Sequence, residues 1–256
     1  MYKKPRPHQK TNEVKIHGRN AALALFRFRS KDIIRVYVHE NETETYSELL
    51  KWCAKNRKAY HQVKDKDLEK LSGAMHHQGI CILAKEKSSL TLRTLQQELP
   101  FHHEPALLVF LDGVGNPHNI GAILRNCAHF GVKYILGTRG KFLGLSPSAH
   151  RISEGGAESV SIVKFDDEIA ALSDLKKLGF SIVVADFKKD AKSLHKFSFP
   201  KRSILVLGAE VEGVSPELHS IADAIVHIPG SGTVESMNVS AVSAVFFNEY
   251  VRQTQI

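Results

Sequence analysis

The sequence lacks any hydrophobic run that is long enough to cross a membrane. Its 256 residues are 43% hydrophobic, which is enough for a sizeable core, but no stretch of about 18 consecutive apolar residues occurs. The N-terminal residues 1–7 are basic, and no apolar segment follows them as it would in a secretory leader. We therefore expect no membrane partner and a location in the cytoplasm.

Cysteine is scarce, and its distribution argues against two kinds of site. The three cysteines, Cys53, Cys81 and Cys127, are far apart, form no CxxC pair and lack the Cys/His spacing typical of zinc ligands. Their odd number also argues against a disulfide framework. The histidines are scattered in the same way. The sequence predicts reduced thiols and no bound metal.

Acidic residues are in deficit, and only in the first part of the chain. Residues 1–98 hold 20 Lys and Arg against 11 Asp and Glu, whereas residues 99–256 hold 15 against 16. The net charge of +8 therefore comes entirely from the N-terminal part. Clustered positive charge is typical of a surface that binds a phosphate backbone, so we expect a nucleic acid as partner. A solubilising tail is the simpler alternative.

The hydrophobic pattern indicates an α/β protein of two domains. A basic flexible tail is expected at residues 1–14, a small α/β domain at 15–87, a linker at 88–104 and a larger domain at 105–256. In the larger domain apolar strands alternate with helices, which predicts a largely parallel sheet covered on both faces. Residues 188–202 form a second basic stretch, either a solvated face or a contact with nucleic acid.

The same pattern predicts where the elements begin and end. Helices are expected, the first of them capped by Asn20, at 21–26, 46–55, 65–71, 120–130, 167–178 and 239–252. Strands are expected at 33–38, 59–63, 80–84, 106–111, 134–136, 159–163, 182–185, 204–207 and 224–228. About three strands therefore belong to the small domain.

Three blocks in the larger domain place small or amide-bearing residues where the chain leaves an apolar strand. They are Asn119–Asn126, Leu207–Gly213 and Ser236–Ser240. The carboxyl ends of the strands in such a sheet are where α/β proteins bind ligands. The three blocks are therefore the best candidates for a functional site.

A dinucleotide-binding loop is one reading of the segment before the first block. Gly113 and Gly115 follow an apolar strand, as the first two glycines of that motif do. The third glycine should stand at position 118, which is His118, and Pro117 occupies the approach to the helix. We therefore reject a nicotinamide cofactor site.

The first block offers Asn119 and Arg125. Asn119 is expected to cap the following helix, which would be a purely structural role. Arg125 lies within the otherwise apolar stretch Gly121–Cys127, and an Arg among buried neighbours needs a partner. A phosphate matches the guanidinium geometry, whereas a plain surface charge is the alternative.

The second and third blocks offer a carboxylate and two further polar groups. Glu210 follows a strand directly, while Ser215, before a proline, is the better cap for the next helix. Glu210 is thus left without a structural task, and we favour a functional one. Ser236 and Asn238 can both cap the last helix, so at least one of them is free to meet a substrate.

In their order and spacing the three blocks resemble the signature of the SpoU–TrmH group of SPOUT RNA methyltransferases, over residues 105–252. Residues 17–22 and 76–80 are similar to the ends of the small module, itself like a ribosomal protein, that many relatives carry. The resemblance implies a C-terminal SPOUT domain folded into a deep trefoil knot, and an N-terminal RNA-binding domain. It implies an S-adenosylmethionine-dependent enzyme that methylates the ribose 2′-hydroxyl of rRNA or tRNA. Such relatives work as homodimers, with RNA and not DNA as partner.

The resemblance also implies roles for eight residues by their motif position. Cofactor contacts are implied at Gly208, Ile228 and Met237, and catalytic or RNA-side roles for Asn119, Arg125, Glu210, Ser236 and Asn238. Two alternatives stay open, namely a non-catalytic RNA-binding relative and an enzyme that modifies a base nitrogen.

Overall fold

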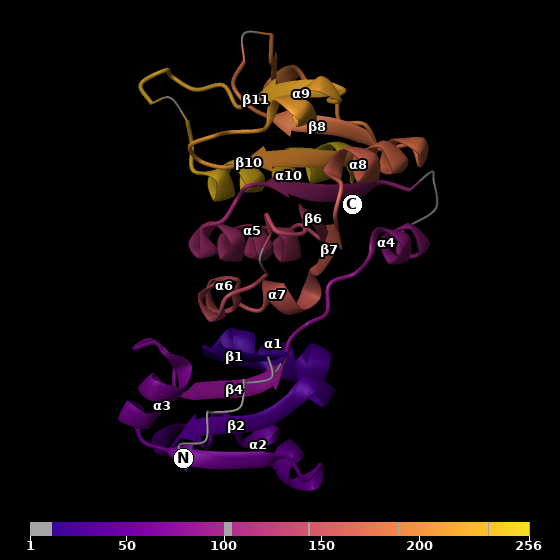
Figure 1. Ribbon diagram of the computed structural model, residues 1–256. Helices are drawn as coiled ribbons and strands as arrows, with labels where there is room; N and C mark the ends of the chain where they lie inside the picture. Colours follow the sequence, from indigo (N-terminus) through magenta and orange to yellow (C-terminus); the bar gives the residue numbers. More distant parts are fainter. Residues whose placement is uncertain (1–11, 100–103, 143, 189, 235, 256) are drawn as a thin grey trace, which may run out of the picture. The chain divides into compact units, whose positions relative to one another are not determined.

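The computed structural model describes residues 12–99, 104–142, 144–188, 190–234 and 236–255 (Figure 1). The chain forms two compact units, residues 1–87 and residues 88–256, and each has its own sheet. The basic tail predicted for residues 1–14 lies outside the described residues up to residue 11. None of the helices in the described part has the length and hydrophobicity that a membrane crossing requires.

The N-terminal unit is a four-stranded sheet with three α-helices. The strands lie in the order β1-β4-β2-β3, with β4 antiparallel to both of its neighbours and β3 parallel to β2. The strands are β1 (Glu13–His17), β2 (Ile33–His39), β3 (Ala59–Val63) and β4 (Ile80–Lys85). The helices are α1 (Arg19–Arg29), α2 (Ser47–Lys55) and α3 (Asp65–Ser72), with short 3₁₀ turns at Ser30–Asp32 and Glu40–Glu42.

The predicted elements of this unit are confirmed, and two features were missed. Strand β1 was not predicted, and its first two residues were read as tail, but Val14 and Ile16 are buried and pair with β4. The sheet therefore has four strands and not three. Helix α1 begins at Arg19 and not after Asn20, because Gly18 precedes it with φ 94°, a value that favours glycine.

The C-terminal unit is built on a seven-stranded sheet in which every pair of neighbours is parallel, which confirms the α/β prediction. The strand order is β7-β6-β5-β10-β8-β11-β9. The strands are β5 (Ala106–Asp112), β6 (Tyr134–Thr138), β7 (Ser161–Phe165), β8 (Ser181–Ala185), β9 (Lys192–Ser193), β10 (Arg202–Gly208) and β11 (Ala224–His227).

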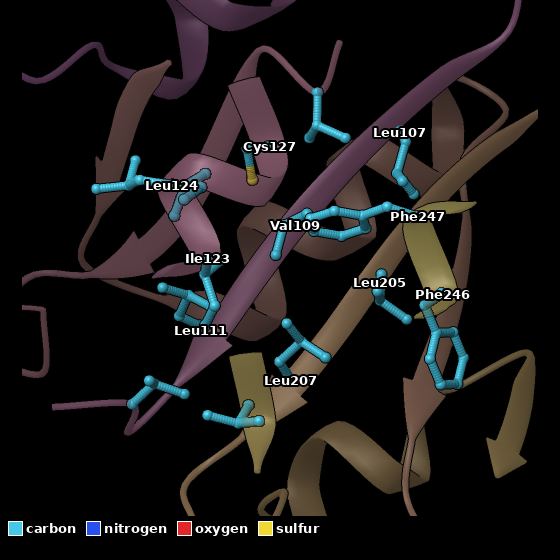
Figure 2. Close-up of a cluster of buried hydrophobic side chains, with 14 of the residues drawn as sticks. Leu107, Val109, Leu111, Ile123, Leu124, Cys127, Leu205, Leu207, Phe246 and Phe247 are labelled. Atoms are coloured by element: carbon cyan, nitrogen blue, oxygen red, sulfur yellow. The ribbon is translucent and has the colours of Figure 1, made fainter. Parts of the chain in front are cut away.

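Successive residues of a strand point to opposite sides of the sheet. Both faces of this sheet therefore carry apolar side chains, and helices cover each of them. On one side Leu107, Val109 and Leu111 of β5 pack with Phe246 and Phe247 (Figure 2). On the other side the intervening β5 residues join a second core. The helices are α4 (Leu92–Glu98), α5 (Pro117–His129), α6 (Pro147–Ile152), α7 (Gly156–Ser159), α8 (Glu168–Lys177), α9 (Pro216–Ser220) and α10 (Val239–Thr254), with a 3₁₀ turn at Leu194–Lys196.

Three expectations differ from the structure in this unit. The strand expected at 159–163 is β7, which begins two residues later, because Gly156–Ser159 forms the short helix α7. The segment 88–104, expected to be a linker, contains α4, whose Leu95 is fully buried in the second core. Leu90 also pairs with Val163 of the edge strand, so this segment packs with the sheet. The helix expected from residue 120 begins at Pro117, one turn earlier, because Asn116 caps it.

Candidate active site

The three sequence blocks meet at the carboxyl edge of the parallel sheet. Strands β5 and β10 are neighbours, and their last residues, Asp112 and Gly208, are paired. The loop after β5 leads into α5, the loop after β10 runs to α9, and the loop after β11 leads into α10. Chain segments about a hundred residues apart therefore converge, as expected for the ligand edge of an α/β sheet.

A ring of hydrogen bonds joins one side chain from each block. Asn119 Nδ2 donates to Glu210 Oε1 over 2.8 Å, and Asn238 Nδ2 donates to the same oxygen over 3.0 Å. Asn238 Nδ2 also lies 3.0 Å from Asn119 Oδ1. We call Asn119, Glu210 and Asn238 the amide–carboxylate cluster. Hydrogen bonds to a charged acceptor are stronger than neutral ones, so the cluster holds the Glu210 carboxylate in a defined position.

Asn119 is free for the cluster because another residue caps its helix. The side chain of Asn116 accepts a hydrogen bond from the backbone N–H of His118 over 2.9 Å, and Pro117 occupies the first helical position. Asn119 lies in the first turn and is only 6% exposed. The prediction that Asn119 caps α5 is therefore wrong, and its amide points to Glu210 instead.

Asn238 serves as a cap and as a cluster member at the same time. Its Oδ1 accepts hydrogen bonds from the backbone N–H and the hydroxyl of Ser240, over 2.9 and 2.6 Å, and so caps α10. Its Nδ2 is left for Glu210. Ser236, two residues earlier, is exposed and has no hydrogen-bond partner among the described residues.

The Glu210 side chain is exposed, and only one of its carboxylate oxygens is used. Oε2 accepts no hydrogen bond from the described part of the chain, whereas Oε1 accepts from both amides. The loop around Glu210 is tight, because Ala209 and Gly213 exchange two backbone hydrogen bonds of 3.2 and 3.0 Å. A Cβ placed on Gly208 would lie 2.3 Å from the carbonyl carbon of Gly213, so only glycine fits there.

Asp112 ties the β5 and β10 loops together, and sequence reasoning missed it. Its carboxylate is nearly buried, and Oδ2 accepts a hydrogen bond from the backbone N–H of Ser215 over 2.8 Å. Lys141 Nζ lies 3.8 Å from the other carboxylate oxygen. Ser215 sits at the start of α9 as predicted, but its hydroxyl makes no capping bond. An aspartate at the end of an apolar strand was the signal available in the sequence.

Arg125 is exposed, which corrects the reason given for singling it out. The apolar residues of α5 face the core, whereas Arg125 faces away from them and has no ion pair or hydrogen bond with the described residues. The structure does not bring it into the amide–carboxylate cluster. Its neighbour Asn126 makes the contact instead, since Nδ2 donates to Ser240 O (2.8 Å) and Ser243 Oγ (2.9 Å) and fixes the start of α10.

The remaining predicted residues lie on loops that expose apolar side chains. Gly208 is the last residue of β10, Ile228 is partly buried against the first core, and Met237 is 45% exposed. The loops after the adjacent strands β10, β8 and β11 carry further exposed apolar side chains, Val211, Phe187 and Val234. The backbone of residues 229–234 makes no backbone hydrogen bond within the described chain. This edge thus offers apolar contacts next to backbone that is not engaged in regular secondary structure.

The fold and the cluster define a protein of two α/β units with a polar side-chain cluster at the carboxyl edge of a parallel sheet. Comparison with known proteins is more specific. The chain belongs to the SpoU rRNA Methylase family, whose model matches residues 106–248. A second model, described as RNA 2′-O ribose methyltransferase substrate binding, matches residues 15–90.

Similar proteins match almost the whole chain. A protein of Escherichia coli O157:H7 named as an uncharacterized tRNA/rRNA methyltransferase, YfiF, is 36% identical over 96% of this chain and 70% of its own length. The 23S rRNA (guanosine-2′-O-)-methyltransferase RlmB of Bordetella pertussis is 31% identical over 93% of this chain and 96% of its own. Among solved structures, the SpoU methyltransferase AviRb of Streptomyces viridochromogenes, in complex with AdoMet, has a TM-score of 0.79. It is 19% identical and covers 94% of this chain and 90% of its own, which shows the shared fold.

Proposed function

We propose that the amide–carboxylate cluster is the site at which this chain methylates a ribose 2′-hydroxyl in RNA. As a member of the SpoU family, the chain is an S-adenosylmethionine-dependent RNA ribose 2′-O-methyltransferase. The observation that carries the site assignment is the ring of hydrogen bonds among Asn119, Glu210 and Asn238. A relative that had lost catalysis would have no need for a carboxylate at this edge with one oxygen held by two amides and the other open to a ligand.

The loops at this edge fit the cofactor. A nucleoside joined to an amino acid needs apolar contacts for its rings and chain, and backbone groups that fix its orientation. The exposed apolar side chains supply the first, and the backbone of residues 229–234, which makes no backbone–backbone hydrogen bond within the described chain, supplies the second. We assign the cofactor contacts to Gly208, Ile228 and Met237. When bound, S-adenosylmethionine supplies a methyl group already activated by its sulfonium.

Glu210 is the group that we assign to the acceptor hydroxyl. Its Oε1 is held by two amides, and its Oε2 is left to accept a hydrogen bond from the ribose 2′-hydroxyl. That hydrogen bond orients the hydroxyl oxygen toward the methyl donor and increases its nucleophilicity. Asn119 and Asn238 act by fixing the carboxylate before the substrate arrives, which avoids a reorganisation cost during the reaction.

Arg125 and Ser236 are assigned to the RNA side of the site. The guanidinium of Arg125 is exposed and has no competing partner in the described chain, so it is available to clamp the phosphate beside the target ribose. A guanidinium stays protonated in proteins, so Arg125 positions the RNA and does not remove the proton. Ser236 lies on the exposed approach to Asn238 and offers a hydroxyl to the same ligand.

The assembly and the topology are part of the proposal. We expect a homodimer in which α10, the last helix, contributes to the interface. Val245 on this helix is an apolar side chain left exposed in the single chain. The trefoil knot and a cytoplasmic location follow from the family and stay predictions. Light scattering after size exclusion would test the dimer.

The experiment that tests the function identifies the labelled nucleoside. The protein is incubated with methyl-labelled S-adenosylmethionine and unmodified rRNA and tRNA transcripts, and the RNA is digested to nucleosides. A labelled 2′-O-methylnucleoside is the expected product, and Glu210→Ala should abolish it. Label on a base nitrogen, or no label although the cofactor binds, would overturn the assignment.

A further inference from the structure

The sheet of the N-terminal unit has one face that its core does not cover. The buried residues Val14, Ile16, Val36 and Val38 point into the core beneath α1 and α2. Side chains alternate along a strand, so their neighbours point to the opposite face. These neighbours, at the centre of the sheet, are Lys15, Arg35, Tyr37, His61, Cys81 and Leu83.

The strand register arranges this second face into rows. Lys15, Leu83 and Arg35 form one row across β1, β4 and β2. Tyr37 and His61 are paired across β2 and β3, and their rings stack with centroids 5.5 Å apart and planes 22° apart. Arg35 Nη1 donates to the Tyr37 hydroxyl over 3.3 Å, which holds a cation beside the two rings.

Helix α3 packs over only part of this face. It contacts β1, β2 and β4, and its Leu71 closes a small cavity of about 50 Å³ that Lys15, Tyr37, Cys81 and Leu83 also line. Toward β3 the face is open, and Arg35 and His61 are exposed. Two flat rings, the exposed cations Arg35 and Lys15 and a small cavity therefore lie side by side on this face.

We propose that Tyr37 and His61 form a stacking platform for an unpaired base of the substrate RNA, with Arg35 and Lys15 contacting the adjacent phosphates. The inference rests on the proposed function and adds the part of the surface that engages the RNA. Nucleobases stack on aromatic side chains whatever their identity, and unpaired bases are the ones that can reach such a ring.

Charge on this face favours RNA over a protein partner. Its strand residues include Lys15, Arg35 and Lys85 but only one carboxylate, Glu13, which lies opposite Lys85 in the strand register. An apolar protein partner would instead call for a larger uncharged patch. Proteins that bind single-stranded nucleic acid combine aromatic rings for stacking with flanking cations in this way.

The test measures binding of a labelled 12-nucleotide single-stranded RNA to the full-length protein by fluorescence anisotropy. His61→Ala should weaken binding at least about fivefold, because one face of the stack is lost. His61→Phe keeps a flat ring and should retain near wild-type affinity. The matched control is Tyr60→Ala, which removes an exposed ring from the same strand but from the opposite face.

Salt dependence separates the two kinds of contact. Arg35→Gln should lower the slope of log Kd against log salt by about one, whereas His61→Ala should leave the slope unchanged. Equal affinity of the wild type and His61→Ala, or an equal loss in Tyr60→Ala, would overturn the platform. A wild-type protein that binds and methylates RNA with an unaffected His61→Ala contradicts only this inference. A wild type that binds the cofactor but methylates no RNA contradicts the proposed function, on which this inference rests.

Discussion

Asn119 and Asn238, 119 positions apart in the chain, are hydrogen-bonded to each other over 3.0 Å and donate to the same oxygen of Glu210. Each amide therefore has its oxygen and nitrogen ends fixed by its neighbours. The oxygen of Asn238 also caps α10, so the geometry of the site and the start of the last helix are set by one side chain. A change at any member of the cluster should disturb catalysis more than folding.

Asn119→Asp should abolish most of the methyl transfer. The new carboxylate would lie about where the amide nitrogen now sits, within hydrogen-bond distance of Glu210, and two like charges repel strongly at that separation. We expect the single-turnover rate to fall at least about 100-fold. The affinity for S-adenosylmethionine, measured by calorimetry, should change little. A rate close to that of the wild type would show that the cluster does not hold the reacting group.

Arg125→Ala should lower activity without lowering stability. Its side chain has no partner among the described residues, so the free energy of unfolding, obtained from thermal melts, should change by less than about 0.5 kcal/mol. The apparent KM for RNA should rise, and Arg125→Lys should restore little, because Lys cannot make the bidentate contact with phosphate. Arg93→Ala, on the exposed side of α4, is the matched control and should leave KM unchanged. Full restoration by Lys would contradict the clamp.

Gly208→Ala should displace the loop that carries Glu210. The added Cβ would meet the carbonyl carbon of Gly213 at 2.3 Å, its oxygen at 2.4 Å and the Val214 nitrogen at 2.5 Å, and this backbone cannot move aside as a flexible side chain would. Overpacking of this kind costs about 1–3 kcal/mol, and we expect S-adenosylmethionine to bind about tenfold more weakly or worse. In Gly115→Ala the nearest atom is 3.9 Å away, so this variant should fold and bind the cofactor normally. Equal behaviour of the two variants would contradict the argument.

Glu249 gives a stability difference that depends on pH. Hydrogen bonds from Arg252 and then from Gln253 lower the pKa of its carboxyl to about 2. A lowered pKa stabilises the folded state above the unfolded pKa of about 4.3, and this contribution is lost as the pH falls toward 2. Because Arg252 is largely exposed, Glu249→Gln should cost only about 0.5–1 kcal/mol at pH 7. Melting temperatures of the two proteins should converge near pH 2, and a constant difference would rule out the ion pair as its cause.

Removing residues 1–87 should weaken RNA binding and flatten its dependence on salt. These residues carry the positive excess of the chain, and each lost phosphate contact lowers the salt slope by about one. Cofactor binding should persist, since the loops assigned to it lie in the other unit. Parallel titrations of both proteins at several salt concentrations measure the effect. Identical slopes would place the RNA contacts elsewhere.

The strands of the C-terminal sheet were predictable because most of them are buried on both faces. Such strands appear as continuous apolar runs, and the runs 106–111 and 204–207 both lie within observed strands. The convergence of the three blocks followed from the parallel arrangement alone. Short elements such as β9 and α6 were missed, because a few residues do not establish a period.

The details of the site depended on contacts that the sequence does not show. Asn116 and Asn119 are both residue types that cap helices. Asn116 caps α5, whereas Asn119 donates to Glu210, which is far away in the sequence. Arg125 was expected among buried neighbours, but a helix exposes one side, and the apolar residues around it in sequence lie on the other. Helix α4 was read as linker because its core partners are far away along the chain.

The β5 strand, the β10 loop and the cap of α10 follow one another in the order in which a ribosome makes them. While the chain is being synthesised, Asn119 emerges long before Glu210, and Glu210 before Asn238. Asp112 can hold Ser215 as soon as β10 has joined the sheet. The carboxylate, however, stays half-fixed until Asn238 has been translated. A nascent or prematurely terminated product that stops short of that residue should therefore have no methyltransferase activity, even if its sheet has formed.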